Sequence, residues 1–274
     1  MTQAHLVRRR ADIDNIDLLI NPSLLGLTLV EISLSELCNR TCSFCPRGMN
    51  NSYPNRNLNM TVETATALIA QLDQSNYEGS LCLSGYGEPT LNPDFFDICN
   101  ILKSYSLELI TNGDNILKGK ITIDQIYDAG VKRVLISDYD RNPIWESFKY
   151  KYPQLIVRDH YDDGTSNLEE YNFNNREGAL QGGTSAIKRP CFIPSYKVVV
   201  DWNGDVIKCC HSWLVKKVIG NIFKTTLSEI WMGEEFSAIR KSLIKGNRID
   251  VPSCRKCDVK GDVFGIQQAK LWEK

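Results

Sequence analysis

Short apolar runs alternate with longer amphipathic stretches from residue 27 to residue 158. The runs predict buried strands, because they are four to eight residues long and bounded by polar or glycine-containing turns. Those strands are expected at 27–34, 80–84, 106–111, 131–137 and 154–158. Between the first two of these strands, apolar residues recur at helical spacing and predict a helix with one apolar face, formed by Val62, Ala65, Leu68, Ile69 and Leu72. Strand–helix alternation predicts a parallel α/β sheet with right-handed crossovers, whose functional groups gather at the carboxyl ends of the strands.

Two further helices are predicted at 95–103 and 144–150 by the same periodicity. Thr122 and Gln125 form a capping box for another helix, which Gly130 ends. Beyond residue 160 the pattern changes, and residues 160–190 are polar enough to predict a loop.

A hairpin is predicted in the last third of the chain, because Asn203-Gly204 separates apolar runs at 196–200 and 206–208. Phe236, Ile239, Leu243 and Ile244 then form one face of a helix. The whole pattern predicts a partial (β/α)6 TIM-like barrel at 27–185. An N-terminal extension, 1–26, precedes this barrel, and a small hairpin-plus-helix domain, 186–274, follows it.

Composition narrows the class of protein. A formal net charge of −1 argues against a broad nucleic-acid surface, which is usually basic. No apolar run is long enough to span a membrane, and residues 1–20 lack the apolar core of a signal peptide. We therefore predict a cytoplasmic protein. In that reducing compartment, clusters among its ten cysteines indicate metal ligands rather than disulfides.

The first cysteine cluster is Cys38, Cys42 and Cys45, with Phe44 just before the last cysteine. Thiolates are the usual ligands of a four-iron cluster, and three of them leave one iron open to a small molecule. Zinc is the alternative metal, but structural zinc takes four ligands, and no fourth cysteine or histidine is close in sequence.

A second cluster comprises Cys191, Cys209, Cys254 and Cys257, from three segments of the C-terminal domain. Four thiolates can close around one metal centre. On their own, these cysteines fit a structural zinc ion and an iron–sulfur cluster equally well.

The first motif resembles the cluster motif of the radical S-adenosylmethionine (SAM) enzymes. The spacing from Cys191 through Gly204 to Cys209 is similar to the start of the auxiliary-cluster motif in their SPASM/twitch branch. Within that branch, the chain most resembles the twitch-type dehydrogenases that oxidise the aminocyclitol 2-deoxy-scyllo-inosamine. Two cysteines that continue the longer motif are missing, so the resemblance implies one auxiliary [4Fe-4S] cluster beside the SAM-binding one.

The resemblance also implies a mechanism. A 5′-deoxyadenosyl radical takes a hydrogen atom from a C–H bond of a sugar, cyclitol or aminocyclitol alcohol, and a ketone forms as an electron passes to the auxiliary cluster. It further implies roles for residues around the SAM-binding cluster. Arg176 would orient the substrate oxygen, and Cys210 is a candidate hydrogen-atom donor. The residues expected to bind SAM are Phe44, Gly85, Tyr86, Gly87, Glu88, Asn112 and Ser137.

Three other hypotheses stay open. The protein could be a radical SAM epimerase with a cysteine hydrogen donor, a SPASM enzyme that modifies ribosomal peptides, or a zinc-stabilised binding module. As partners we expect a small-molecule substrate and a reductant such as flavodoxin or ferredoxin, without nucleic acid or membrane.

Overall fold

An open eight-stranded sheet forms the centre of the computed structural model, which describes residues 13, 21–48, 53–160, 174–180, 187–213 and 217–273. The strand order is β5-β4-β3-β2-β1-β6-β7-β8. Neighbours from β5 to β6 are parallel, whereas β7 and β8 are antiparallel additions. The strands are β1 (Leu29–Ser33), β2 (Ser80–Ser84), β3 (Ser106–Thr111), β4 (Arg133–Asp138), β5 (Ile156–Asp159), β6 (Lys197–Val200), β7 (Asp205–Ile207) and β8 (Val218–Asn221).

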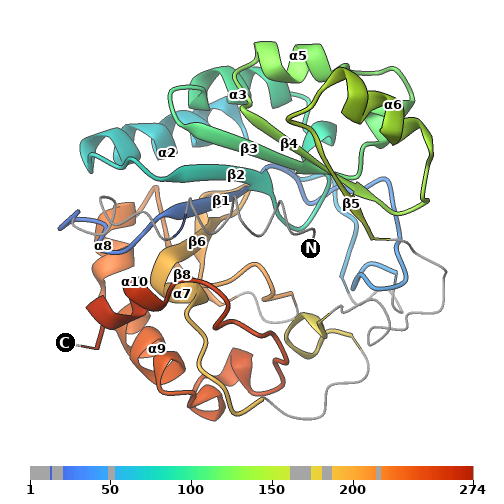
Figure 1. Cartoon of the computed structure of the whole chain (residues 1–274). Coiled ribbons are helices and arrows are strands. Elements are labelled where there is room, and N and C mark those ends of the chain that lie inside the picture. The colour runs from blue at the N-terminus through green and yellow to red at the C-terminus, as the bar shows by residue number, and fades with distance from the viewer. Residues whose placement is uncertain are drawn as a thin grey trace.

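Helices cover one face of the parallel strands, and a second group lies beside the antiparallel end (Figure 1). The first group is α2 (Val62–Gln74), α3 (Phe95–Leu102), α4 (Asp114–Leu117), α5 (Ile123–Asp128) and α6 (Ile144–Lys151). The second group is α7 (Ile193–Tyr196), α8 (Leu227–Met232), α9 (Glu234–Ile244) and α10 (Ile266–Leu271). None of the helices in the described part of the chain combines the length and the apolar character that a bilayer crossing needs.

The two faces of the strands have different roles, because successive side chains of a strand point to opposite sides. On β1, Val30 and Ile32 are fully buried in the main hydrophobic core. Leu29 and Glu31 line a cavity on the other side of the sheet. The same division recurs on β2, where Leu81 and Leu83 are in the core and Cys82 and Ser84 line the cavity. One face therefore stabilises the fold, and the other is available for binding.

The predicted elements are confirmed, with ends that differ by a few residues. Helix α5 has the predicted capping box between Thr122 and Gln125. The α/β class with an open, mostly parallel sheet is confirmed as well. Most of the predicted extension 1–26 and most of the predicted polar loop, namely 161–173 and 181–186, lie outside the described residues.

Strand β6 lies beside β1, at the opposite end of the parallel array from β5. The chain between β5 and β6 therefore connects the two ends of the parallel array, and residues 174–180 belong to this connection. The register pairs Val30 with Val198, so the hairpin predicted for the C-terminal domain extends the barrel sheet itself. The boundary near residue 186 stays a prediction, and hydrogen bonds of the sheet cross it.

Candidate functional site

A cavity of about 980 Å³ opens at the carboxyl ends of the parallel strands. This volume is at the upper end of small-molecule pockets, so there is room for a cofactor together with a small substrate. Every residue that the sequence suggested for SAM, substrate or the first cluster lines this cavity. These are Cys38, Cys42, Phe44, Cys45, Gly85, Tyr86, Gly87, Glu88, Asn112, Ser137, Arg176 and Cys210.

The first cysteine set lies on the loop that follows β1. The loop turns tightly, because the amide of Cys45 donates to the carbonyl of Cys42 at 3.0 Å. All three thiols are half-buried at the cavity wall. Burial raises the pKa of Cys38 to about 11, so this thiol needs a metal partner to become a thiolate near neutral pH. The loop thus presents three thiols to one cavity, as a cluster with one open iron requires.

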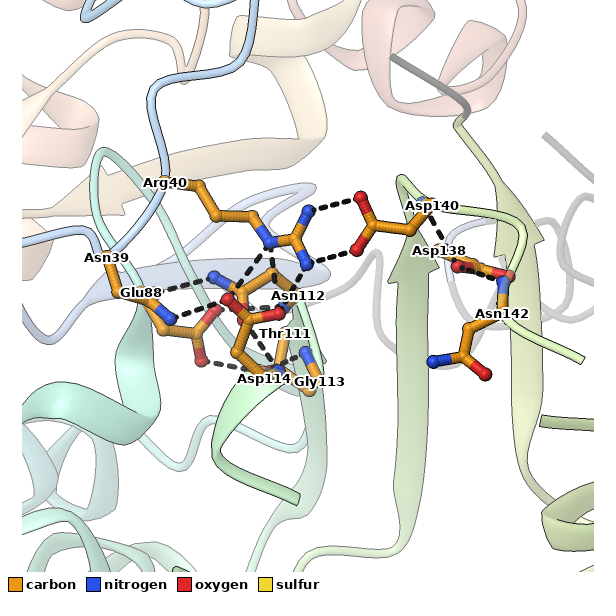
Figure 2. A network of polar contacts seen from close by, with 10 residues as sticks. All are labelled: Asn39, Arg40, Glu88, Thr111, Asn112, Gly113, Asp114, Asp138, Asp140 and Asn142. Carbon is orange, nitrogen blue, oxygen red and sulfur yellow. Dashed lines mark hydrogen bonds and ion pairs between the residues drawn. The ribbon is translucent and has the colours of Figure 1, made fainter. Parts of the chain in front are cut away.

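Polar contacts fasten this loop to the ends of neighbouring strands (Figure 2). Arg40 donates from Nε to Asp114 at 3.0 Å and from Nη1 to Asp140 at 3.0 Å. Asn39 donates to Asp114 at 2.7 Å and accepts from the side chain of Asn112 at 2.8 Å. Asn112 is therefore occupied with positioning the loop, while its expected role in binding SAM stays a prediction.

The turn Gly85–Pro89 needs its glycines because it packs closely on the end of β1 and on the loop that follows β1. A Cβ on Gly85, where φ is +106°, would lie 2.5 Å from the Cβ of Ser33. A Cβ on Gly87 would lie 2.3 Å from the carbonyl oxygen of Ser35. The sequence analysis expects both glycines to bind SAM; their close neighbours in the structure are residues of the protein.

Glu88 ties the ends of β2 and β3 together. Its buried carboxylate accepts hydrogen bonds from the amides of Thr90 and Asn112 and from the hydroxyls of Thr90 and Thr111. Burial raises the pKa of Glu88 above its usual value. Its expected role in binding SAM stays a prediction, since the carboxylate already has four donors.

Arg158, at the end of β5, is a cavity residue that the sequence analysis did not identify. Its Nη2 donates to the hydroxyl of Ser137 at 2.7 Å, whereas its Nε is buried without a hydrogen-bond partner among the described residues. A buried guanidinium group with an unused donor is costly unless an anion binds there. Arg158 and Ser137 together fit a carboxylate, which SAM possesses. The ring of Phe44 lies near this wall, 5.4 Å from that of Tyr139.

Arg176 extends into the same cavity from a short turn on the crossover to β6. Its Nη1 is 3.5 Å from Nδ1 of His211, and its Nε has no hydrogen-bond partner in the described residues. Cys210 lies nearby on the wall, where its sulfur accepts from Nζ of Lys197 at 3.3 Å. Lys197 also forms an ion pair with Glu31 of β1. This part of the cavity wall is therefore polar and charged.

The second cysteine set surrounds a smaller cavity. Cys191, Cys209, Cys254 and Cys257 all line it, and all are buried. Burial raises the pKa of Cys191 to about 11 and that of Cys257 to about 12, so these thiols too would need a metal to ionise. Among the described residues, no three His, Cys, Asp or Glu side chains form a group that could hold a single metal ion. That the four thiols together hold an iron–sulfur cluster stays a prediction, which their shared cavity supports.

The two cavities share a wall, because Ile193 and Val259 line both. Cys209 and Cys210 are consecutive residues that face different cavities. Sequence reasoning found the thiols from their spacing but missed Glu31, Arg158, Lys197 and Lys208. The signal available for these was the placement of charged residues inside otherwise apolar strand runs.

Family models match both halves of the site. Residues 32–137 match the radical SAM superfamily, and residues 191–258 match SPASM, an iron–sulfur cluster-binding domain. The second match begins at Cys191 and ends one residue beyond Cys257.

Among curated proteins, the chain is 26% identical over 239 residues to the S-adenosyl-L-methionine-dependent 2-deoxy-scyllo-inosamine dehydrogenase of Niallia circulans. That alignment covers 84% of this chain and 92% of the relative. The crystal structure of BtrN in complex with AdoMet and 2-DOIA has a similar fold, with a TM-score of 0.73 and 22% identity over 85% of this chain and 94% of that one. An open conformation of BtrN gives a TM-score of 0.64 at 21% identity, over 85% of this chain and 92% of that one.

Proposed function

Because residues 32–137 match the radical SAM superfamily and residues 191–258 match the SPASM domain, we propose that the chain is a radical SAM dehydrogenase of a polar alcohol. The substrate class is a sugar, cyclitol or aminocyclitol, and the product is the corresponding ketone. The curated relative is named as a dehydrogenase of an aminocyclitol, which supports this class.

Cys38, Cys42 and Cys45 would hold the SAM-binding [4Fe-4S] cluster, and Cys191, Cys209, Cys254 and Cys257 a single auxiliary one. When bound, these groups and SAM supply one-electron chemistry that removes a hydrogen atom from a C–H bond and accepts the second electron of the oxidation. A reducing protein such as flavodoxin or ferredoxin would deliver the starting electron.

The chain's own residues bind, orient and shield the reactants. Arg158 and Ser137 would hold the carboxylate of SAM, for which Arg158 has an unused donor. Phe44, only 6% exposed, shields the cavity from water beside the cluster loop. Arg176 would donate to the substrate hydroxyl and stabilise negative charge on its oxygen as the proton leaves, because a guanidinium group stays protonated.

One observation supports this function above the others: two cysteine sets line adjacent cavities, and Arg176 lies in the cavity of the first set. A fully ligated second centre has no site for a substrate, but it can accept an electron from the adjacent cavity, which shares Ile193 and Val259 with its own. An oxidation needs such an acceptor, whereas a redox-neutral rearrangement does not.

Metal analysis and a product assay test the proposal. Anaerobically reconstituted protein should contain about eight irons and eight sulfides per chain, and a variant with Cys38, Cys42 and Cys45 all changed to alanine about half of each. Incubation with SAM, a reductant and candidate polyols should yield a product that has lost two hydrogens. Stoichiometric zinc without sulfide would contradict the proposal.

Epimerisation is a second candidate, because Cys210 lines the cavity and could return a hydrogen atom to the substrate. In deuterated water an epimerase would give a product of the same composition with solvent deuterium on carbon. The variant Cys210→Ala separates the two functions, since a dehydrogenase keeps its ketone product and an epimerase loses turnover.

A further inference from the structure

A buried ion pair lies inside the cavity of the second cysteine set. Nζ of Lys208 is 2.5 Å from Oε1 of Glu177, and the two side chains are 1% and 4% exposed. Both residues line the cavity together with the four thiols. The sulfur of Cys254 lies 3.8 Å from the same carboxylate oxygen of Glu177. The pair is therefore part of the lining that a cluster in this cavity would contact.

A contribution to folding stability does not by itself explain why this ion pair is buried. Removing two charges from water costs several kcal/mol per ion, and apolar residues of similar volume often serve a fold equally well. The wall around the pair already offers apolar packing from Ile193, Leu243 and Val259. A charged pair in this position therefore points to a function.

The backbone that presents Glu177 is strained, which supports the same conclusion. Arg176, Glu177 and Gly178 have consecutive positive φ angles of 49°, 61° and 89°. Non-glycine residues in this region cost about 1 kcal/mol or more each and cluster at functional sites. With this backbone conformation, two consecutive side chains point in different directions. Arg176 lines the larger cavity with the first cysteine set, and Glu177 lines the smaller cavity with the second cysteine set.

The turn is also fastened to the segment that bears the last two thiols. Asn175 is fully buried, and its side chain donates to the carbonyl of Lys256 at 2.6 Å. The backbone N–H of Asn175 donates to the carboxylate of Asp258 at 2.8 Å. A Cβ on Gly178 would lie 2.9 Å from the Cβ of Lys256, so the contact is close. Glu177 is thus held at a fixed position relative to Cys254 and Cys257.

We propose that Glu177 and Lys208 are part of the auxiliary-cluster site and set the reduction potential of that cluster. The inference rests on the proposed function, which places a cluster on these four cysteines. Charge and hydrogen bonds near the sulfur atoms are among the factors that fix such potentials. In a buried site the field of each charge is weakly screened, so each residue acts on the cluster with its own sign.

Two single variants test the pair by the direction of their effects. Glu177→Gln removes a negative charge and keeps a hydrogen-bond acceptor for Lys208, so reduction of the cluster becomes easier. Lys208→Gln removes the positive charge, so reduction becomes harder. At a fixed ambient potential, we expect each variant to change the ratio of reduced to oxidised auxiliary cluster about tenfold. The two changes should have opposite directions. A tenfold change in this ratio corresponds to a shift of ~59 mV in the reduction potential of a one-electron couple.

The measurement is a redox titration followed by electron paramagnetic resonance of the reconstituted full chain. The variant with Cys38, Cys42 and Cys45 changed to alanine provides the signal of the auxiliary cluster alone. Glu235→Gln is the matched control, because it makes the same chemical change in a solvent-exposed ion pair with Lys217. It should leave the ratio unchanged, since exposed charges are strongly screened.

Shifts of opposite sign support the proposal. Shifts of the same sign, or no shift in either variant, overturn it, because a merely structural pair would disturb the cluster without regard to charge. If one variant does not retain the second cluster, the test rests on the other variant, whose reduced-to-oxidised ratio must shift in the direction given above. A wild-type protein without a second cluster overturns the proposed function and this inference together, whereas two intact clusters with an unmoved ratio overturn this inference only.

Discussion

Arg158 shows how a single residue can indicate a ligand. Burial lowers the pKa of its guanidinium group. Among the described residues, its side chain donates a hydrogen bond from Nη2 to the Ser137 hydroxyl. The buried Nε has none within the described residues. Such a residue is tolerated when an anion completes its contacts. Under the proposed function, the partner is the carboxylate of the amino acid moiety of SAM.

The variant Arg158→Gln should therefore bind SAM about 10- to 100-fold more weakly, because hydrogen bonds to charged groups contribute about 1.5–3 kcal/mol. Equilibrium dialysis with reconstituted protein measures the effect. Arg141→Gln is the control, since Arg141 pairs with Asp159 at the surface, with both side chains more than half exposed. Equal affinity of Arg158→Gln and the wild type would show that the carboxylate binds elsewhere.

Between elements, the loop that bears the first thiols is held by Arg40, which bridges the ends of β3 and β4 (Figure 2). Arg40 contacts Asp114, which is 10% exposed, and Asp140, which is 57% exposed. Only the first of these contacts is shielded enough to matter much for stability. The side chain also lies over the ring of Tyr139, 5.5 Å from its centroid.

We expect Arg40→Gln to lower the free energy of unfolding of the metal-free protein by about 1–2 kcal/mol, since it leaves Asp114 without its cation. Urea denaturation followed by circular dichroism measures this value. The exposed control Arg141→Gln should cost less than about 1 kcal/mol. If the two variants are equally stable, the bridge does not hold the loop.

Glu88 connects β2 to β3 and gives a dependence on pH. Burial raises the pKa of this carboxyl in the folded state, so ionisation favours the unfolded chain. Its contribution to stability is fully present below the unfolded pKa of about 4.3 and is lost as pH rises through the higher folded value. Glu88→Gln cannot ionise. The stability of the wild type relative to this variant should therefore fall with rising pH above ~4.3, as urea titrations at several pH values would measure. A constant difference would contradict this assignment.

The parts of the site that the sequence predicted depend on local pattern. Cys38, Cys42 and Cys45 are close in the chain, and the capping box at Thr122 is set by neighbouring residues. The parts that it missed depend on distant partners. Glu31 and Lys197 are far apart in sequence and meet only because β6 lies beside β1. The charge of Arg158 in an apolar strand run marks it as unusual, but the sequence does not show that it shares a cavity with Arg176 and His211. Pattern therefore predicts elements and ligand spacing, whereas pairing between distant strands decides which charges share a cavity.

At the scale of the whole molecule, the sheet joins the two matched domains. Strand β6 follows Cys191 in the chain, yet it hydrogen-bonds to β1 in the radical SAM half. Leu227 of α8 donates from its amide to the side chain of Gln71 in α2 at 2.7 Å, and Ser228 donates to the carbonyl of Ser23 at 2.7 Å. The contacts are too many and too buried for the C-terminal domain to be an independent attachment.

A fragment of residues 1–185 should consequently fail to fold as a stable unit. Without β6, the strand β1 becomes an edge with unpaired amides and carbonyls, and edges of this kind associate with other chains. We expect the fragment to elute as aggregates in size-exclusion chromatography and to show no cooperative unfolding transition. The full metal-free chain should unfold in one transition, detected equally by fluorescence and circular dichroism. A monomeric fragment with its own sharp transition would show instead that the boundary predicted near residue 186 separates two folding units, and that the continuous sheet forms only after each unit has folded.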